Sequence, residues 1–170
     1  MQGERSTFVD ERARDPNTDP LEVVERMAAA NNWFFERAVE DEITLIVTGK
    51  WTNYHVSFTW MNEIDVLHLA CAFDIRVPEP RLPEVQQLIV LINEQLWVGH
   101  FDVWKENGWV MFRQALVLAG GMPATGQQCE AALGLALEAC ERYFPAFHLV
   151  VWARKPARDA MDTAKSAEQI

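Results

Sequence analysis

The sequence predicts an α+β domain in which an antiparallel β-sheet of about five to six strands packs against three helices. Two alternating apolar runs flank Asn107-Gly108, a pair typical of hairpin turns. After Trp33 the apolar period changes from about 3.6 residues to about 2, as it does where strands follow a helix. The connections that follow are short, so neighbouring strands must be antiparallel. The expected order of elements is α-β-β-β-β-α-β-β-α.

The first helix is expected to begin at Pro20. Asp19 occupies the N-cap position, and proline suits the first helical position because its missing N–H would be unpaired there anyway. The helix should end near Asn31-Asn32, and its apolar stripe consists of Leu21, Val24, Met27 and Ala28. Residues 1–18 are polar and show no apolar period, which predicts a mobile leader.

Four strands are expected next, over residues 34–39, 43–48, 54–61 and 66–77. Side chains alternate between the faces of a strand, so one face of the third strand carries Tyr54, Val56, Phe58 and Trp60. The fourth strand directs another apolar set inward, consisting of Leu67, Leu69, Cys71, Phe73 and Ile75. The proline-rich connector 78–83 cannot continue a strand ladder.

The second helix is expected from Pro83 to about Val98, with a main stripe of Val85, Leu88, Ile89, Ile92 and Leu96. The third helix should begin after Thr125, whose spacing to Gln128 fits a capping box. It should stop at Pro145, because proline lacks the N–H that a helix needs there.

Two segments close the chain. Residues 147–152 are apolar and are expected to form a last strand or an extended stretch packed on the core. Residues 156–170 are polar with weak helix propensity, which predicts a mobile tail. A single domain over residues 19–155 is the resulting expectation.

The hairpin of residues 101–118 lies at the centre of this fold. A two-residue turn would give Asn107 and Gly108 positive φ angles and would place Trp104 opposite Met111. One face then forms part of the core, with Phe101, Val103, Val110, Phe112, Leu116 and Leu118. The other face mixes a charge pair with aromatic and sulfur side chains: Asp102, Trp104, Glu106, Trp109, Met111 and Arg113.

Composition limits the function. The chain of 170 residues is 49% hydrophobic and 24% charged, as expected of a soluble domain. A net charge of −10 disfavours nucleic acid and anionic membranes as partners, and it favours either solubility or a basic partner. The N-terminus shows no signal peptide, and no apolar run reaches the roughly 18 residues of a membrane helix. Three cysteines without a CxxC pair predict reduced thiols in the cytoplasm.

No pattern of a catalytic, cofactor or metal site stands out. The four histidines lack metal-ligand spacing, namely His55, His68, His100 and His148. Cys71 is interpreted as a small buried hydrophobe rather than a nucleophile. Four acids lie near a polar turn and are expected to be solvated: Glu36, Glu40, Asp41 and Glu42. We therefore expect no enzyme, no cofactor and no metal.

The surplus of aromatic residues is the feature that a plain core explains poorly. Seven tryptophans in 170 residues is high. Trp104, Trp109 and Met111 lie on the hairpin face opposite Val103, and these residue types are enriched where proteins meet. This face is a candidate partner surface, with intramolecular cover by a helix as the alternative.

The second helix offers a candidate dimer interface. Its run 88–92 is continuously apolar. At about 100° per residue, Val90 and Trp97 fall on one flank of the stripe, and Leu91 and Val98 fall on the other. Either a neighbouring loop such as the proline connector covers these flanks, or a second copy of the chain does so around a two-fold axis.

Several motifs occur in a recognisable order: Asn93, Gly99-His100-Phe101, Asn107-Gly108, Val110-x-Phe112-Arg113 and Arg142-Tyr143-Phe144-Pro145. Over roughly residues 20–150 the chain resembles the YbjN family, described as bacterial sensory transduction regulators. The resemblance implies a fold similar to that of the class I type III secretion chaperones. It also implies a small, cytoplasmic, non-enzymatic and dimeric protein that binds other proteins.

Three functions remain open on the sequence. The first is a protein-binding module, chaperone-like or regulatory, that acts as a homodimer. The second is a sensor that holds an apolar or amphipathic small molecule in a pocket between the sheet and the helices. The third is an enzyme of unknown type, for which no triad, metal set or acid pair is present.

Overall fold

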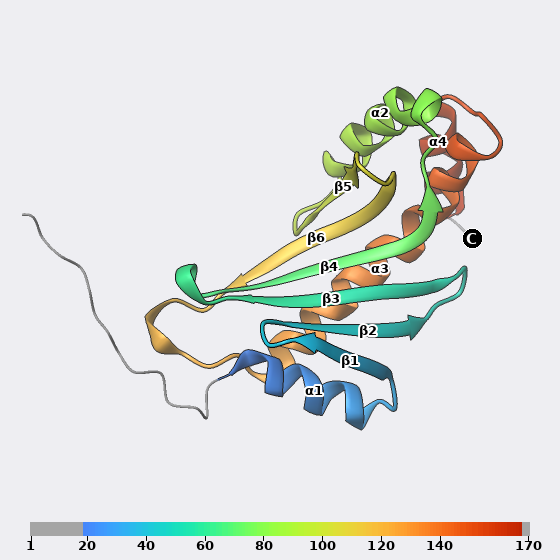
Figure 1. The fold of residues 1–170 in the computed structure, drawn as a ribbon. Helices are drawn as coiled ribbons and strands as arrows, with labels where there is room; N and C mark the ends of the chain where they lie inside the picture. The colour runs from blue at the N-terminus through green and yellow to red at the C-terminus, as the bar shows by residue number, and fades with distance from the viewer. Residues whose placement is uncertain (1–18, 168–170) are drawn as a thin grey trace, which may run out of the picture.

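The computed structural model describes residues 19–167, and it is an α+β fold as predicted. One six-stranded antiparallel sheet has the strand order β1-β2-β3-β4-β6-β5 (Figure 1). The strands are β1 (Phe34–Val39), β2 (Glu42–Thr48), β3 (Asn53–Met61), β4 (Val66–Arg76), β5 (His100–Trp104) and β6 (Trp109–Val117). The helices are α1 (Pro20–Ala30), α2 (Leu82–Asn93), α3 (Gly126–Val151) and α4 (Ala157–Ala167). The described residues thus form four helices, one more than expected.

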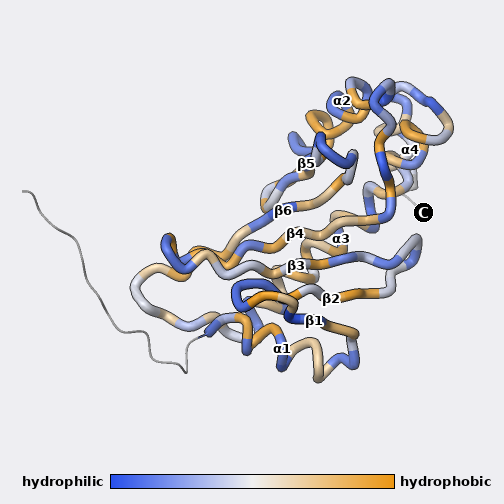
Figure 2. The backbone as a smooth tube through the Cα atoms, viewed as in Figure 1, coloured by the Kyte–Doolittle hydropathy of each residue, from blue (hydrophilic) through white to orange (hydrophobic). Residues whose placement is uncertain are grey.

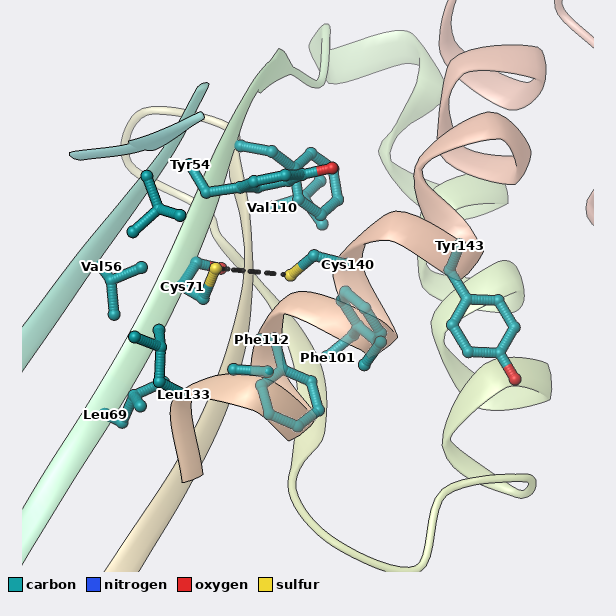
Figure 3. Packing of buried hydrophobic residues seen from close by; sticks show 14 of the residues in the cluster. Tyr54, Val56, Leu69, Cys71, Phe101, Val110, Phe112, Leu133, Cys140 and Tyr143 are labelled. Atoms are coloured by element: carbon teal, nitrogen blue, oxygen red, sulfur yellow. Dashed lines mark hydrogen bonds between the residues drawn. The ribbon is translucent and has the colours of Figure 1, made fainter. Parts of the chain in front are cut away.

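The core lies between one face of the sheet and the helices. Helix α3 packs on β4 and β6, α1 packs on β2 and β3, and α2 packs on β5 (Figure 1). The inward side chains of β4 are all buried, as the alternation predicts, and these are Leu67, Leu69, Cys71, Phe73 and Ile75. Figure 3 shows Cys71 facing Cys140 of α3, with their Sγ atoms 3.6 Å apart. Both thiols are buried among apolar side chains, and the pKa of Cys140 is raised mainly by desolvation.

The predicted start of α1 is confirmed. The carboxylate of Asp19 accepts a hydrogen bond from the backbone N–H of Leu21 at 2.9 Å, which is the expected N-cap contact. The other carboxylate oxygen of Asp19 lies 2.8 Å from Nη2 of Arg37 on β1. One side chain therefore both caps the helix and joins it to the first strand.

The predicted two-residue turn of the hairpin is wrong. Trp104 lies opposite Trp109, so residues 105–108 form a four-residue loop. The carbonyl of Trp104 accepts the N–H of Gly108 at 2.7 Å, and only Gly108 of the pair has a positive φ, at 72°. The register differs from the expected one by two residues. Because side chains alternate with period two, every residue within β5 and β6 stays on its predicted face, whereas Glu106 lies in the loop.

The edge of β5 is occupied by a side chain. Asn93, at the end of α2, donates from Nδ2 to the carbonyl of Phe101 at 3.1 Å. Its Oδ1 accepts the N–H of Phe101 at 2.8 Å. Helix α2 ends at Asn93, so the prediction that it continues to about Val98 is wrong. Its last side chain pairs with the backbone of the strand that follows.

Pro145 does not end α3, contrary to the prediction. The helix continues to Val151, so residues 147–152 are neither a strand nor extended. Pro145 has no N–H to give to the carbonyl of Glu141 four residues earlier. The indole Nε1 of Trp51, in the turn between β2 and β3, donates to that carbonyl at 3.0 Å. The helix can therefore pass through proline, because a distant side chain supplies the missing donor.

Two further contacts fix the same turn to α3. The N–H of Lys50 donates to Oε1 of Glu141 at 2.6 Å. The ring of Trp51 is nearly parallel to that of Phe144, with centroids 6.3 Å apart. The turn between β2 and β3 is thus held on α3 at the position of Pro145.

Residues 157–167 form helix α4. The prediction of a mobile tail with weak helix propensity is therefore wrong for these residues. One face of α4 packs against α2 and α3 and is buried at Ala157, Ala160, Met161 and Ala164. The N–H of Ala157 donates to Oε1 of Glu84 on α2 at 2.6 Å. The segment is polar on average, and the amphipathic spacing of its alanines and Met161 was overlooked for that reason. The predicted leader 1–18 lies outside the described residues, and the boundaries of the domain stay a prediction.

We predict that Trp51→Phe lowers the free energy of unfolding by roughly 1–2 kcal/mol, because it keeps the ring but leaves the carbonyl of Glu141 without its donor. Urea denaturation followed by circular dichroism measures this change. Trp104→Phe is the matched control and should have little effect, because Trp104 is 54% exposed. Equal midpoints for the wild type and Trp51→Phe would contradict the role of the indole.

Candidate functional site

The candidate site lies on the face of the sheet opposite the core, called here the open face. No described helix packs on this face, and α3 passes behind the strands in Figure 1. By register, the open face carries residues of five strands. These are Glu42, Thr44 and Ile46 of β2, His55, Ser57 and Thr59 of β3, His68, Ala70 and Ala72 of β4, His100, Asp102 and Trp104 of β5, and Trp109, Met111 and Arg113 of β6.

The open face is hollowed at its centre. The hollow has a volume of about 820 Å³. Small side chains of the two middle strands line it, namely Ser57, Ala70 and Ala72. The other residues that line it are Glu42, His55, Thr59, His68, Asp102, Val103, Trp104, Lys105, Met111 and Arg113, and the side chain of Val103 itself points to the core. The volume lies within the range of small-molecule sites.

A chain of polar contacts crosses three strands at this hollow. Arg113 of β6 donates from Nε to Nε2 of His68 on β4 at 3.3 Å. Its Nη1 lies 3.4 Å from Oδ2 of Asp102 on β5. Arginine can only donate, so Nε2 of His68 is the acceptor and carries no proton. Burial lowers the pKa of His68, and the nearby charges of Arg113 and His100 lower it further.

The predicted partner surface lies at one end of the open face. Trp104 is 54% exposed and lies opposite Trp109, which is half-buried. The ring of Trp109 packs edge-on against His55, and the guanidinium of Arg76 lies 5.5 Å above it. Met111 is buried. No described helix covers these three residues, so the intramolecular alternative finds no support in the described part of the chain.

The sheet brings together three of the four histidines. His55, His68 and His100 lie on the open face of β3, β4 and β5, whereas His148 lies on α3 beside Phe144. Within residues 19–167 no cluster of His, Cys, Asp and Glu could hold a metal ion. The sequence analysis missed the contact of Arg113 with His68, because it depends on the pairing of β4 with β6 across 45 residues.

The acids near the first hairpin have different environments. Glu42 is half-buried on the open face, and its Oε2 accepts a hydrogen bond from Thr59 at 3.1 Å. Glu36, Glu40 and Asp41 are exposed, as expected of solvated groups.

The predicted dimer interface divides into two parts. Val90, Trp97 and Val98 are exposed, and Trp97 is fully so at 100%. Leu91 is half-buried against the core. Figure 2 shows the apolar run of α2 in orange. A shallow hollow of about 170 Å³ lies beside Trp97 and is bordered by Leu135 of α3.

Comparison with known proteins gives two matches to report. Residues 20–149 match the family model YbjN, described as "Putative bacterial sensory transduction regulator". The crystal structure of YbjN from E. coli, described as "a putative transcription regulator", is similar with a TM-score of 0.52 and 10% identity. This match covers 71% of the chain described here and 85% of the E. coli chain, and it shows the fold alone. A search among curated proteins gave no match. The expected likeness to the class I type III secretion chaperones stays a prediction.

In the described part of the chain, no helix has both the length and the apolar character needed to cross a membrane.

We predict that stability falls as pH drops below about 6.5, the ordinary pKa of histidine. The unfolded chain takes up a proton on His68 at that pH, whereas the folded chain resists it because the pKa of His68 is lowered. The contribution of neutral His68 to the free energy of unfolding is complete above about pH 6.5, and it is lost as the pH falls toward the lower pKa of His68 in the folded chain. Urea denaturation at about pH 7.5 and about pH 5.5 measures the difference.

His68→Gln should make this pH dependence smaller, because its amide oxygen still accepts from Arg113 but does not titrate. The matched control is His55→Gln, which removes an exposed histidine of the same face and should keep the dependence. Equal pH dependence in the wild type and His68→Gln would contradict the assignment to His68.

Proposed function

Since the chain belongs to the YbjN family, we propose that it is a regulatory, chaperone-like protein that acts in the cytoplasm by binding another protein. The family description names a regulator and no reaction. The side chains that could serve catalysis are otherwise engaged: Cys71 is buried in the core, and Nε2 of His68 accepts from Arg113. These features support binding rather than catalysis.

The observation that supports this proposal most strongly is the pair Trp104 and Trp109 at one end of the open face, called here the aromatic end. Trp104 and Trp109 lie next to each other on a sheet face that no described helix covers. Tryptophan is the residue type most enriched at binding hot spots, and an exposed aromatic cluster marks an interaction site. The net charge of −10 favours a basic partner.

A second candidate function, a sensor for a small molecule, is supported by the hollow of the open face. The sequence analysis expected such a pocket between the sheet and the helices. That space is packed by aromatic rings, with Phe101 and Phe147 only 5.2 Å apart between their centroids and Phe73 close to both. A ligand site therefore belongs to the open face.

We also propose that the protein forms a homodimer through Val90, Trp97 and Val98. A two-fold contact needs a self-complementary surface. The hollow beside Trp97 is bordered by Glu138 and Arg142, so the surface has one acid and one base next to its exposed apolar side chains. Leu91 packs against the core of its own chain and is left out of this interface.

We predict that replacing Trp104 by Ser abolishes binding of the partner protein. The tagged wild-type protein should retain a protein from a bacterial lysate that Trp104→Ser does not retain, because the exposed anchor side chain is lost. The matched control is Trp152→Ser, since Trp152 is 65% exposed on the far end of α3. Retention of the same proteins by wild type and Trp104→Ser would contradict the proposed surface.

We predict that Trp97→Glu converts a dimer into a folded monomer, because it places a charge in a desolvated contact. Light scattering after size exclusion reports the mass, and circular dichroism reports the fold. Trp152→Glu should remain dimeric. A monomeric wild type at micromolar concentration, or a dimeric Trp97→Glu variant, would refute the interface.

A further inference from the structure

We propose that the hollow of the open face binds an organic carboxylate, whose anionic head is held by Arg113 and His68 and whose hydrocarbon body lies over Ala70 and Ala72 toward Trp104. The proposal rests on the second candidate function and gives it a ligand class. It assigns a role to a set of polar groups that the aromatic partner surface does not use.

The head-group position follows from the contacts of Arg113. Its two contacts are long, at 3.3 Å to His68 and 3.4 Å to Asp102. The side chain of Asp102 is 49% exposed, so its ion pair with Arg113 is weak and a ligand can replace it. A guanidinium has five donors in a planar fork, which matches the two oxygens of a carboxylate.

The expected charge of the ligand follows from the hydrogen bonds that the charged side chains of the hollow already make. Glu42 accepts a hydrogen bond from Thr59, and Asp102 accepts one from the N–H of Val103 at 2.8 Å. The positive groups of the lining are Arg113 and Lys105. Both acids therefore accept a hydrogen bond from a neighbouring protein group. Arg113 makes only long contacts, so its guanidinium can form shorter hydrogen bonds with an anionic ligand.

The body of the ligand follows from the side chains that line the hollow. Ser57, Ala70 and Ala72 are too small to fill the space above β3 and β4. Apolar side chains of β5 and β6 line its other side, namely Trp104 and Met111. A hydrocarbon chain on these surfaces is removed from water, which contributes about 25 cal/mol for each Å² of apolar area.

Binding should be linked to a proton. When a carboxylate engages Arg113, Nε2 of His68 loses its donor and can take up a proton, which adds a second positive charge beside the ligand. The other charged or titratable groups around His68 are Glu42 of β2, His55 of β3, His100 and Asp102 of β5, Arg113 of β6 and Lys105 of the loop. An anion offsets the repulsion between protonated His68 and Arg113. By reciprocity, affinity for the anion rises as the pH falls.

The test is a titration with octanoate, followed by amide and imidazole NMR shifts at about pH 7.5 and about pH 5.5. We expect saturable shifts on the open face of β4, β5 and β6, and affinity at least about fivefold higher at the lower pH. Octanol lacks the charge, and inorganic phosphate lacks the body, so each should bind more weakly than octanoate. Absence of saturable shifts, or equal binding of octanol, overturns the proposal.

Two variants locate the site. Arg113→Gln should lose octanoate binding, whereas Arg26→Gln, an exposed arginine of α1, should keep it. His68→Gln should bind octanoate with little pH dependence. Undiminished binding by Arg113→Gln, or an unchanged pH dependence in His68→Gln, would overturn the assignment. Saturable shifts with octanol or inorganic phosphate but not with octanoate would overturn the carboxylate and keep the hollow as a ligand site. Failure of the proposal is therefore distinguishable from failure of the sensor function on which it rests.

Discussion

The helical side of this fold depends on α3 staying continuous through Pro145. The C-terminal half of α3 provides the surface on which α4 packs, and it brings Phe147 against Phe73 and Phe101. The indole of Trp51 stabilises that half by satisfying the carbonyl that proline leaves without a donor. The turn between β2 and β3 is therefore not a passive connection. It supplies one hydrogen bond that α3 cannot make for itself, from a position some 90 residues earlier in the chain.

The two faces of the sheet carry different kinds of side chains, because alternate residues of each strand point to opposite faces. The inward face carries the large side chains, and α1, α2 and α3 cover it over strands β2 to β6. The outward face carries alanine and serine at its centre, with Arg113, His68 and the tryptophans beside them. A sheet whose outward face served only solubility would need neither the hollow nor the aromatic end. Both features support the binding function proposed for the open face.

Period and capping signals were enough to predict the α+β class, the strand faces and the start of α1, because each depends on residues close in sequence. The turn of the hairpin was misjudged because Asn107-Gly108 also suits a four-residue loop with glycine in the left-handed region. Helix α4 was missed because the segment is polar on average, although its apolar residues share one face. The extension of α3 was missed because its donor is Trp51, far away in the sequence. The same limit applies to the site. Trp104, Trp109 and Met111 could be identified within one hairpin, whereas the pairing of Arg113 with His68 required the register of β4 against β6.

The side chain of Asn93 has a consequence for how the sheet can associate. Its amide offers Phe101 a donor and an acceptor in the arrangement that another strand would offer. The next outward N–H along β5, that of Val103, is taken by the carboxylate of Asp102. The β5 edge therefore has few free hydrogen-bonding groups for an incoming strand, and this protects it from edge-to-edge aggregation. Growth of the sheet by strand addition is disfavoured at this end, so a sheet that extended across two molecules would more readily be joined at β1.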